Sequence, residues 1–182
     1  MSSPSATAPR CAARRIWAAD VARVLIVGCG CRGRALAEAL SADGHAVRGT
    51  SRTEEGCAAI AAAGIEAALA DPERLGTVMA QLPGVSVVCW LMGSATGDAE
   101  QLAGLHSMRL RTLLERLVDT PVRGLVYEAA GSCAPELLQS GEALVEDARG
   151  RWHMPVAVVD AYPSPVKEWV AAQLAAVAAT LQ

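Results

Sequence analysis

Short apolar segments alternate along the chain with segments whose apolar residues recur at helical spacing. Residues 24–27 (VLIV) form a continuous apolar run, which is typical of a strand covered on both faces. From residue 32 to residue 42 the apolar residues instead fall three and four positions apart, as they do on one face of a helix. This alternation predicts βα units around a parallel sheet.

The same pattern continues to the end of the chain and predicts six strands and six helices. The predicted strands are 24–27, 46–51, 65–69, 85–91, 124–127 and 155–159. The predicted helices are 32–42, 53–63, 72–82, 99–118, 135–152 and 166–181, with Thr53 as an N-cap and a break at Gly141. Right-handed crossovers then give an α/β fold with a single doubly wound parallel sheet of the Rossmann type, in the order 3-2-1-4-5-6, with helices on both faces.

The last predicted helix carries one apolar stripe that has two interpretations. The stripe consists of Val166, Trp169, Val170, Leu174, Val177 and Leu181. It either packs on the sheet or pairs two copies of the chain in a homodimer.

The N-terminal segment differs in composition from the rest of the chain. Residues 1–19 contain three arginines and no acidic residue among Ser, Ala and Pro. A disordered tail, a start codon assigned too early and a transit peptide all fit this composition. We therefore exclude residues 1–20 from the fold and expect residues 21–182 to form one Rossmann domain.

Composition and charge exclude several classes of function. The net charge is −3, and no basic face interleaved with aromatic residues indicates a nucleic-acid partner. No apolar run approaches the roughly 18 residues that a membrane span requires. The six cysteines form no CxxC pair and no Cys/His spacing suited to zinc, so we expect reduced cysteines, no metal and a cytoplasmic protein.

The segment between the first strand and the first helix has the glycine spacing of a dinucleotide site. Gly28 permits the tight turn, Gly30 lets the backbone approach a diphosphate, and Gly33 allows the helix to pack closely on the strand. Cys31 and Arg32 lie in the same loop, where the free N–H groups of a helix N-terminus favour an anion. The alternative is a strand–helix turn without a ligand.

The end of the second strand predicts which dinucleotide binds. NAD binders usually carry Asp or Glu there for the ribose 2′-hydroxyl, whereas this chain has Thr50, Ser51 and Arg52. Two hydroxyls and a guanidinium suit a 2′-phosphate, and one charge-assisted hydrogen bond corresponds to a preference of about 10- to 100-fold. We therefore expect NADP(H) rather than NAD(H), with Arg32 as a second positive charge. The alternative for both arginines is a solvated loop position.

The residues from 24 to 52, VLIVGCGCRGRALAEALSADGHAVRGTSR, resemble the opening of atypical members of the extended short-chain dehydrogenase/reductase superfamily. The resemblance covers about residues 23–160 and is strongest at the front. It implies that Asp71, which follows the third strand, meets the adenine ring. A plain N-cap role for Asp71 is compatible with that contact.

The chain departs from this superfamily at the catalytic residues. The resemblance implies a Tyr-x-x-x-Lys pair, but Tyr127 has no lysine four residues later, and Tyr162 precedes the single lysine, Lys167, by five. Glu128, Ser132 and Tyr162 are the remaining catalytic candidates, each with a structural role as the alternative. A nucleotide-binding or sensing module is therefore the first functional hypothesis, and an NADP-dependent oxidoreductase or epimerase with an unconventional acid/base is the second.

A weaker resemblance, to the front halves of β-hydroxyacid dehydrogenases and ketopantoate reductases, shares the glycine motif and the arginine. Those enzymes also need a helical second domain with a catalytic lysine, for which we expect no room in this chain.

Overall fold

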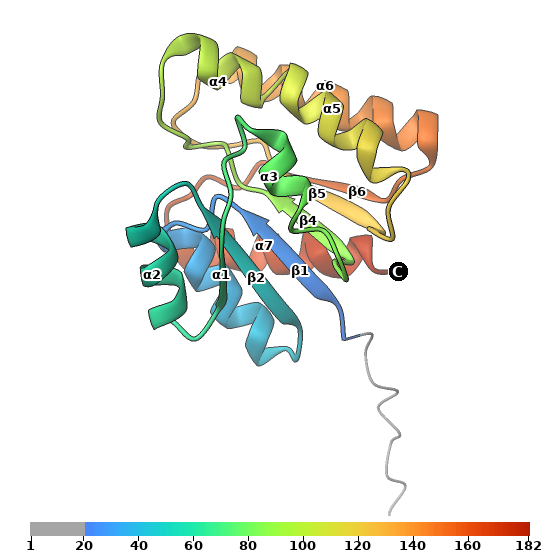
Figure 1. Ribbon diagram of the computed structural model, residues 1–182. Helices are drawn as coiled ribbons and strands as arrows, with labels where there is room; N and C mark the ends of the chain where they lie inside the picture. The colour runs from blue at the N-terminus through green and yellow to red at the C-terminus, as the bar shows by residue number, and fades with distance from the viewer. Residues whose placement is uncertain (1–20) are drawn as a thin grey trace, which may run out of the picture.

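The computed structural model describes residues 21–182, and the six strands in this part of the chain form one parallel sheet (Figure 1). The strands lie in the order β3-β2-β1-β4-β5-β6, so the predicted fold class and strand order are confirmed. Their bounds are β1 Arg23–Val27, β2 Ala46–Ser51, β3 Glu66–Leu69, β4 Val87–Trp90, β5 Gly124–Glu128 and β6 Val156–Val159. The strand order reverses between β1 and β4, which is where open α/β sheets place their ligands.

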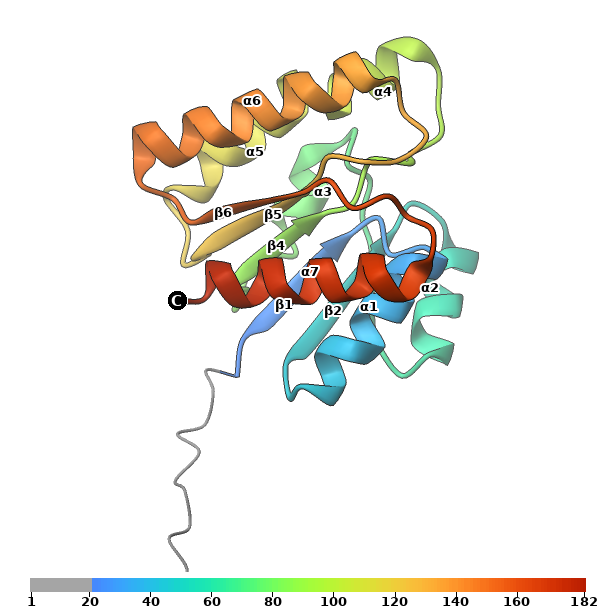
Figure 2. The ribbon, with the colours of Figure 1, turned by 180° about the vertical axis from the view of Figure 1, so that it is seen from behind.

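Helices cover both faces of the sheet. Their bounds are α1 Cys31–Ala42, α2 Glu54–Ala62, α3 Leu75–Met79, α4 Ala99–Leu105, α5 Met108–Leu117, α6 Pro135–Trp152 and α7 Val166–Thr180. Helices α1, α2 and α7 lie on one face, and α3, α4, α5 and α6 lie on the other (Figure 1 and Figure 2). The chain therefore has three layers with the sheet in the middle.

The last four residues of β1, Val24 to Val27, are all apolar because both faces of the strand are covered. Leu25 and Val27 join the core under α3–α6, while Val24 and Ile26 join the core under α1, α2 and α7. All four side chains are fully buried, because a parallel strand in the centre of a sheet has helices on both sides. This burial fixes the position of the glycine loop that follows β1.

The predicted helix 99–118 is wrong, because the structure has two helices there. Helix α4 ends at Leu105 and α5 begins at Met108. Between them His106 is fully buried, and its Nδ1 lies 2.7 Å from the Tyr127 hydroxyl. The interruption therefore coincides with a buried polar contact that the helical spacing does not reveal.

The predicted break at Gly141 is also wrong, because α6 runs without interruption from Pro135 to Trp152. Gly141 is buried at a point where a Cβ atom would lie 2.5 Å from Cζ of Tyr127. The glycine thus permits a close contact between α6 and β5 rather than ending the helix.

Helix α3 begins later than the predicted start at residue 72. Asp71 accepts a hydrogen bond from the Glu73 N–H at 3.0 Å, and the Thr77 hydroxyl donates to the Asp71 carbonyl at 3.1 Å. These local side-chain bonds hold a turn in place of the first helical residues. Asp71 therefore stabilises a turn and does not cap a helix that starts at Pro72.

Helix α7 packs on the sheet of its own chain, as the first interpretation of its stripe expects. Its buried residues are Trp169, Gln173, Ala176, Val177 and Thr180. Val166, which the predicted stripe included, is 42% exposed. The buried face is thus rotated from the predicted one.

Three further expectations concern the N-terminal residues, a membrane span and a metal site. The prediction for residues 1–20 lies outside the described residues. Among residues 21–182 no helix combines the length and the apolar character needed to cross a bilayer. In the same part of the chain no group of three or more His, Cys, Asp or Glu side chains is arranged to hold a metal ion.

Candidate functional site

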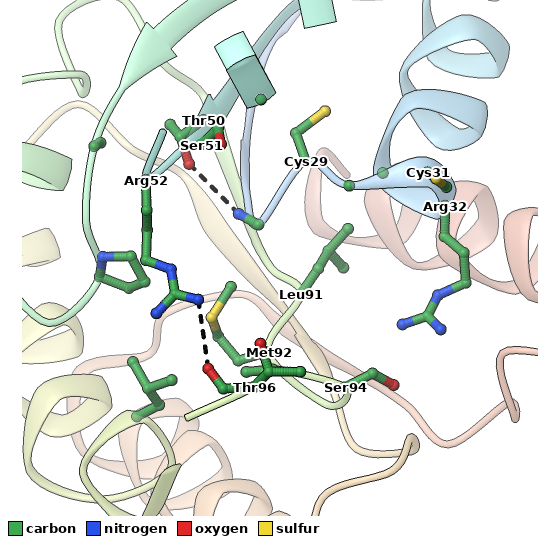
Figure 3. Close-up of a pocket in the computed structure, with 18 of the residues that line it drawn as sticks. Cys29, Cys31, Arg32, Thr50, Ser51, Arg52, Leu91, Met92, Ser94 and Thr96 are labelled. Atoms are coloured by element: carbon green, nitrogen blue, oxygen red, sulfur yellow. Dashed lines mark hydrogen bonds between the residues drawn. The ribbon is translucent and has the colours of Figure 1, made fainter. Parts of the chain in front are cut away.

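A pocket of about 390 Å³ opens at the carboxyl ends of β1, β2 and β4 (Figure 3). It is lined by the glycine loop 28–33, by residues 50–52 at the end of β2, and by residues 91, 92 and 94–96 after β4. This is the crevice where the strand order reverses, and its volume falls in the range of small-molecule sites.

The glycine loop has the local geometry that the sequence predicts. Gly28 has a φ of +87°, and a Cβ atom there would lie 2.8 Å from the Leu91 carbonyl oxygen. A Cβ on Gly30 would meet no atom within 4 Å, so Gly30 leaves open space above the loop. A Cβ on Gly33 would lie 3.2 Å from the Gly28 carbonyl oxygen, which fits close packing of helix on strand.

The first turn of α1 faces this open space. No side chain among the described residues caps α1 at Gly30. Cys31, the first residue of the helix, is exposed and lines the pocket, and its Sγ accepts a hydrogen bond from Arg34 at 3.4 Å. An uncapped helix N-terminus offers N–H donors and a partial positive charge to an anion.

The three residues at the end of β2 all line the pocket but differ in their hydrogen bonds. The Thr50 hydroxyl accepts from the Gly28 N–H at 3.4 Å and donates to the Ile26 carbonyl at 3.3 Å, so it ties β2 to β1. Ser51 lines the pocket and accepts a hydrogen bond from the Thr53 N–H. Arg52 reaches across the pocket (Figure 3).

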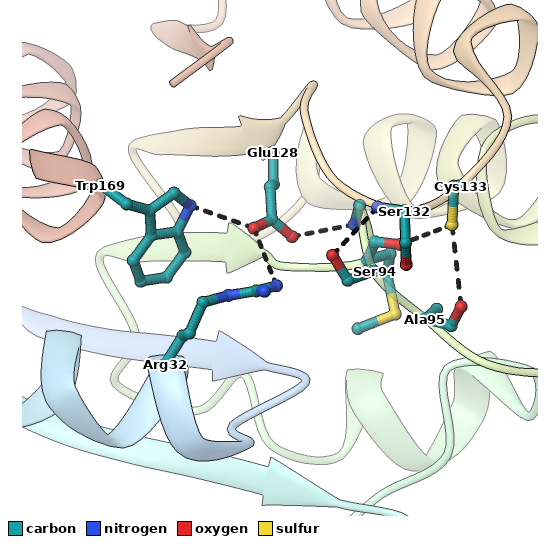
Figure 4. A network of polar contacts seen from close by, with 9 residues as sticks. Arg32, Ser94, Ala95, Glu128, Ser132, Cys133 and Trp169 are labelled. Atoms are coloured by element: carbon teal, nitrogen blue, oxygen red, sulfur yellow. Dashed lines mark hydrogen bonds and ion pairs between the residues drawn. The ribbon is translucent and has the colours of Figure 1, made fainter. Parts of the chain in front are cut away.

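Arg32 lies away from Arg52, on the opposite side of the pocket (Figure 3). Its Nη2 lies 3.4 Å from Oε1 of Glu128, and its guanidinium stands over the Trp169 ring at 5.5 Å from the ring centre. Figure 4 shows these three side chains meeting between α1, the end of β5 and α7. Arg32 thus pairs with the Glu128 carboxylate and does not add the second positive charge beside Arg52 that the sequence predicted.

Glu128 is fully buried and does not line the pocket. Besides Arg32, its carboxylate accepts from the Gly93 N–H at 2.9 Å and from Nε1–H of Trp169 at 3.1 Å. Burial raises the pKa of Glu128, while the charge of Arg32 and the two N–H donors act in the opposite direction. The side chain therefore holds neighbouring groups and does not face a ligand directly.

The other catalytic candidates also lie outside the pocket lining. Tyr162 follows β6 and is 64% exposed. Ser132 is exposed, and its N–H donates to the hydroxyl of Ser94, which does line the pocket. Asp71 lies next to Ala70 and Pro72, which line the pocket, but its own side chain bonds to the local backbone.

Tyr127 points away from the pocket. Its hydroxyl donates to the Leu138 carbonyl at 3.1 Å and lies 2.7 Å from Nδ1 of His106, within the core under α3–α6. Burial raises the pKa of Tyr127, which keeps the phenol protonated at neutral pH. Tyr127 is therefore a structural residue of the layer opposite α1.

The sequence reasoning missed Trp169 and Thr96 among the residues of the site. Trp169 forms part of the pocket wall behind Arg32, although the helical stripe indicated only packing. Thr96 supplies the carbonyl that meets Arg52 across the pocket. The sequence contained one indication of the buried polar network. Glu128 ends the buried segment GLVYE, and a buried charge needs hydrogen-bond partners.

Comparison with known proteins shows similarity at the level of the fold. No protein-family model and no curated protein sequence matches the chain. A short-chain dehydrogenase/reductase superfamily protein from Agrobacterium tumefaciens with bound NAD matches with a TM-score of 0.62 and 22% identity, covering 76% of this chain and 48% of that one. The Citrobacter triphenylmethane reductase complexed with NADP(H) matches with a TM-score of 0.57 and 17% identity, covering 76% and 48%.

A third similar structure is a mutant UDP-glucuronic acid 4-epimerase from Bacillus cereus in complex with NAD. Its TM-score is 0.57 and its identity 15%, covering 75% of this chain and 55% of that one. The chain thus spans about half the length of these three proteins. It has the Rossmann fold of short-chain dehydrogenase/reductase structures, so the resemblance inferred from the sequence is confirmed at the level of the fold.

Proposed function

We propose that this chain binds NADP(H) in the pocket at the carboxyl ends of β1, β2 and β4. The observation that carries the proposal is Arg52, which stands where NAD binders carry an acid and lines the same pocket as the uncapped first turn of α1. The similar structures that contain NAD or NADP(H) support the choice of a dinucleotide.

The diphosphate would lie against the glycine loop. Gly30 leaves the approach to the backbone open, because a Cβ at this position meets no atom within 4 Å. The N–H groups of Cys31, Arg32 and Gly33 belong to the first turn of α1 and would donate to the phosphate oxygens. Gly28 sets the turn that brings this helix end to the pocket.

The adenosine half would lie toward β2, where Ser51 and Arg52 would receive the 2′-phosphate. Thr50 supports this end of the site indirectly, because its hydroxyl already bonds to the glycine loop. The segment around Asp71 would border the adenine, as the family resemblance implies. A guanidinium favours a phosphate over a hydroxyl through charge-assisted hydrogen bonds, so NADP(H) would bind more tightly than NAD(H).

The role that fits these residues best is a nucleotide-binding or sensing module of the atypical short-chain dehydrogenase/reductase type. Both tyrosines lie outside the pocket lining, and the sequence has no Tyr-x-x-x-Lys pair. A second role, an NADP-dependent oxidoreductase or epimerase with an unconventional acid/base, is favoured by the Ser94 hydroxyl in the pocket wall. A bound nicotinamide would supply the hydride chemistry itself.

Calorimetric titration with NADPH, NADP⁺, NADH and NAD⁺ tests the binding proposal. We expect micromolar binding of the two phosphorylated dinucleotides and no binding of any of them to Gly30→Ala, whose methyl group would occupy the space above the loop. Gly150→Ala is the matched control, because this exposed position also has open space but lies far along α6. Absence of binding of all four ligands to the unmodified protein contradicts the proposal.

A further inference from the structure

Glu128 joins three separate parts of the fold through one buried carboxylate. Its donors are the Gly93 N–H from the loop after β4, Nε1–H of Trp169 from α7, and the Arg32 guanidinium from α1 (Figure 4). Glu128 and Trp169 are both fully buried. A carboxylate placed at the end of β5, without direct access to the pocket, is suited to holding other groups in place.

Arg32 is held from two sides but keeps hydrogen-bonding capacity. Glu128 contacts its Nη2, and Trp169 stacks against the guanidinium at 5.5 Å from the ring centre. The Nε atom of Arg32 is buried and has no partner among the described residues. The side chain is 29% exposed and lines the pocket, so its remaining donors are accessible to a ligand there.

The sheet topology shows which part of a dinucleotide Arg32 can reach. If Arg52 binds the adenosine end near β2, the other half of the ligand runs from β1 toward β4 and β5. Arg32 starts in the first turn of α1, at the diphosphate, and extends toward the end of β5. The guanidinium thus lies on the side of the second phosphate, the one that carries the nicotinamide ribose.

We propose that Glu128 is a positioning residue that, together with Trp169, holds Arg32 ready to bind the second phosphate of the dinucleotide. This inference rests on the proposed function, because it assigns further residues to the same site. Neutralising the phosphate requires guanidinium donors that a ligand can reach, and the exposed part of the Arg32 side chain supplies them at the pocket.

The charge of Glu128 is part of this arrangement. Arg32 faces it from α1, and the uncharged Trp169 faces it from α7. Burial is the main cause that raises the pKa values of Tyr127 and Cys133, and the charge of Glu128 raises them further. Burial raises the pKa of Glu128 above that of an ordinary carboxyl. Acidification through this raised pKa neutralises Glu128, releases Arg32 and weakens dinucleotide binding.

The affinities for two ligands distinguish this role of Glu128 and Arg32 from a general effect on the fold. NADPH carries both phosphates of the diphosphate, whereas adenosine 2′,5′-bisphosphate carries the adenosine half without the second one. The variants are Arg32→Met, Glu128→Gln and the double variant. For NADPH we expect dissociation constants raised by about 10- to 100-fold in Arg32→Met.

A smaller loss is expected for Glu128→Gln, and the double variant should equal Arg32→Met, because Glu128 acts through Arg32. Adenosine 2′,5′-bisphosphate should bind all variants within about twofold of the unmodified protein, which also shows that they are folded. The NADPH affinity of the unmodified protein should fall on acidification, whereas that of Glu128→Gln should remain low at every pH.

Three results overturn the inference while leaving the proposed function intact. These are NADPH binding to both single variants as tightly as to the unmodified protein, an equal loss for the two ligands, and tighter NADPH binding to Glu128→Gln. Failure of the unmodified protein to bind either ligand refutes the proposed function itself.

Discussion

The guanidinium of Arg52 donates a hydrogen bond to the carbonyl oxygen of Thr96 at 3.4 Å and so joins the end of β2 to the loop after β4. This contact spans the pocket (Figure 3). It is long for a hydrogen bond to a neutral acceptor, so a phosphate group would replace it readily with a charge-assisted one. Arg52, which should select the dinucleotide, thus lies across the pocket in which the dinucleotide would bind.

Gly28 and Gly30 should respond differently to the same added methyl group. Gly28→Ala puts a residue with a side chain at a φ of +87° and brings its Cβ against Leu91 and Met92, so we expect a loss of about 2 kcal/mol or more in the free energy of unfolding. Gly30→Ala should cost less than about 1 kcal/mol, because it meets no protein atom and affects only the N-cap.

Urea denaturation and NADPH titration of the two variants check this difference. Gly30→Ala should remain folded and lose NADPH, as expected if the space above the loop belongs to the diphosphate. A Gly30→Ala variant that binds NADPH normally shows that the diphosphate does not approach the loop there.

Tyr127→Phe should destabilise the protein without changing ligand binding. The substitution removes a hydroxyl that bonds to His106 and to the Leu138 carbonyl in a fully buried position, and the polar atoms left unpaired cost about 1–3 kcal/mol. Tyr162→Phe, at an exposed position, is the control and should change neither property. Reduced NADPH affinity in Tyr127→Phe with unchanged stability would instead assign Tyr127 to the site.

Glu66 should make a small, pH-dependent contribution to stability. The hydrogen bonds from Arg48, at 2.8 and 2.7 Å, lower the pKa of Glu66 first of all, and Arg23 on β1 adds to the effect. A lowered pKa stabilises the folded state above the pKa of the unfolded chain, and this stabilisation disappears as the pH falls through the folded-state value.

Glu66→Gln should therefore lower the free energy of unfolding at pH 7 by less than about 1 kcal/mol, since the carboxylate is half exposed and screened. Urea denaturation at several pH values should show the difference shrinking toward acidic pH, and added salt should reduce it at pH 7. A difference that grows on acidification contradicts the assigned ion pairs.

The alternation of apolar runs and helical patterns was sufficient to predict the sheet and the glycine loop. The strand order follows from right-handed crossovers, and the N-cap at Thr53 is confirmed by its bond to the Gly56 N–H. These features are local in sequence or follow from general topology. They could therefore be predicted without knowing any tertiary contact.

The features that the sequence did not predict depend on contacts between distant elements. The interruption at His106 and the continuous helix through Gly141 both reflect the ring of Tyr127, which lies on another strand. The direction of Arg32 is set by Glu128 and Trp169, which follow it by 96 and 137 residues in the chain. Periodicity within one element contains no information about such partners.

The ratio of the NADH and NADPH dissociation constants, measured by calorimetry, tests the central claim most directly. We expect a ratio of about 10 to 100 for the unmodified protein and a ratio near 1 for Arg52→Ala, because the variant loses the charge-assisted bond to the 2′-phosphate. Arg111→Ala, at an exposed position on α5, should keep the original ratio. An unmodified protein with equal affinity for the two ligands, or an Arg52→Ala variant that weakens both equally, contradicts the claim that Arg52 selects NADP(H).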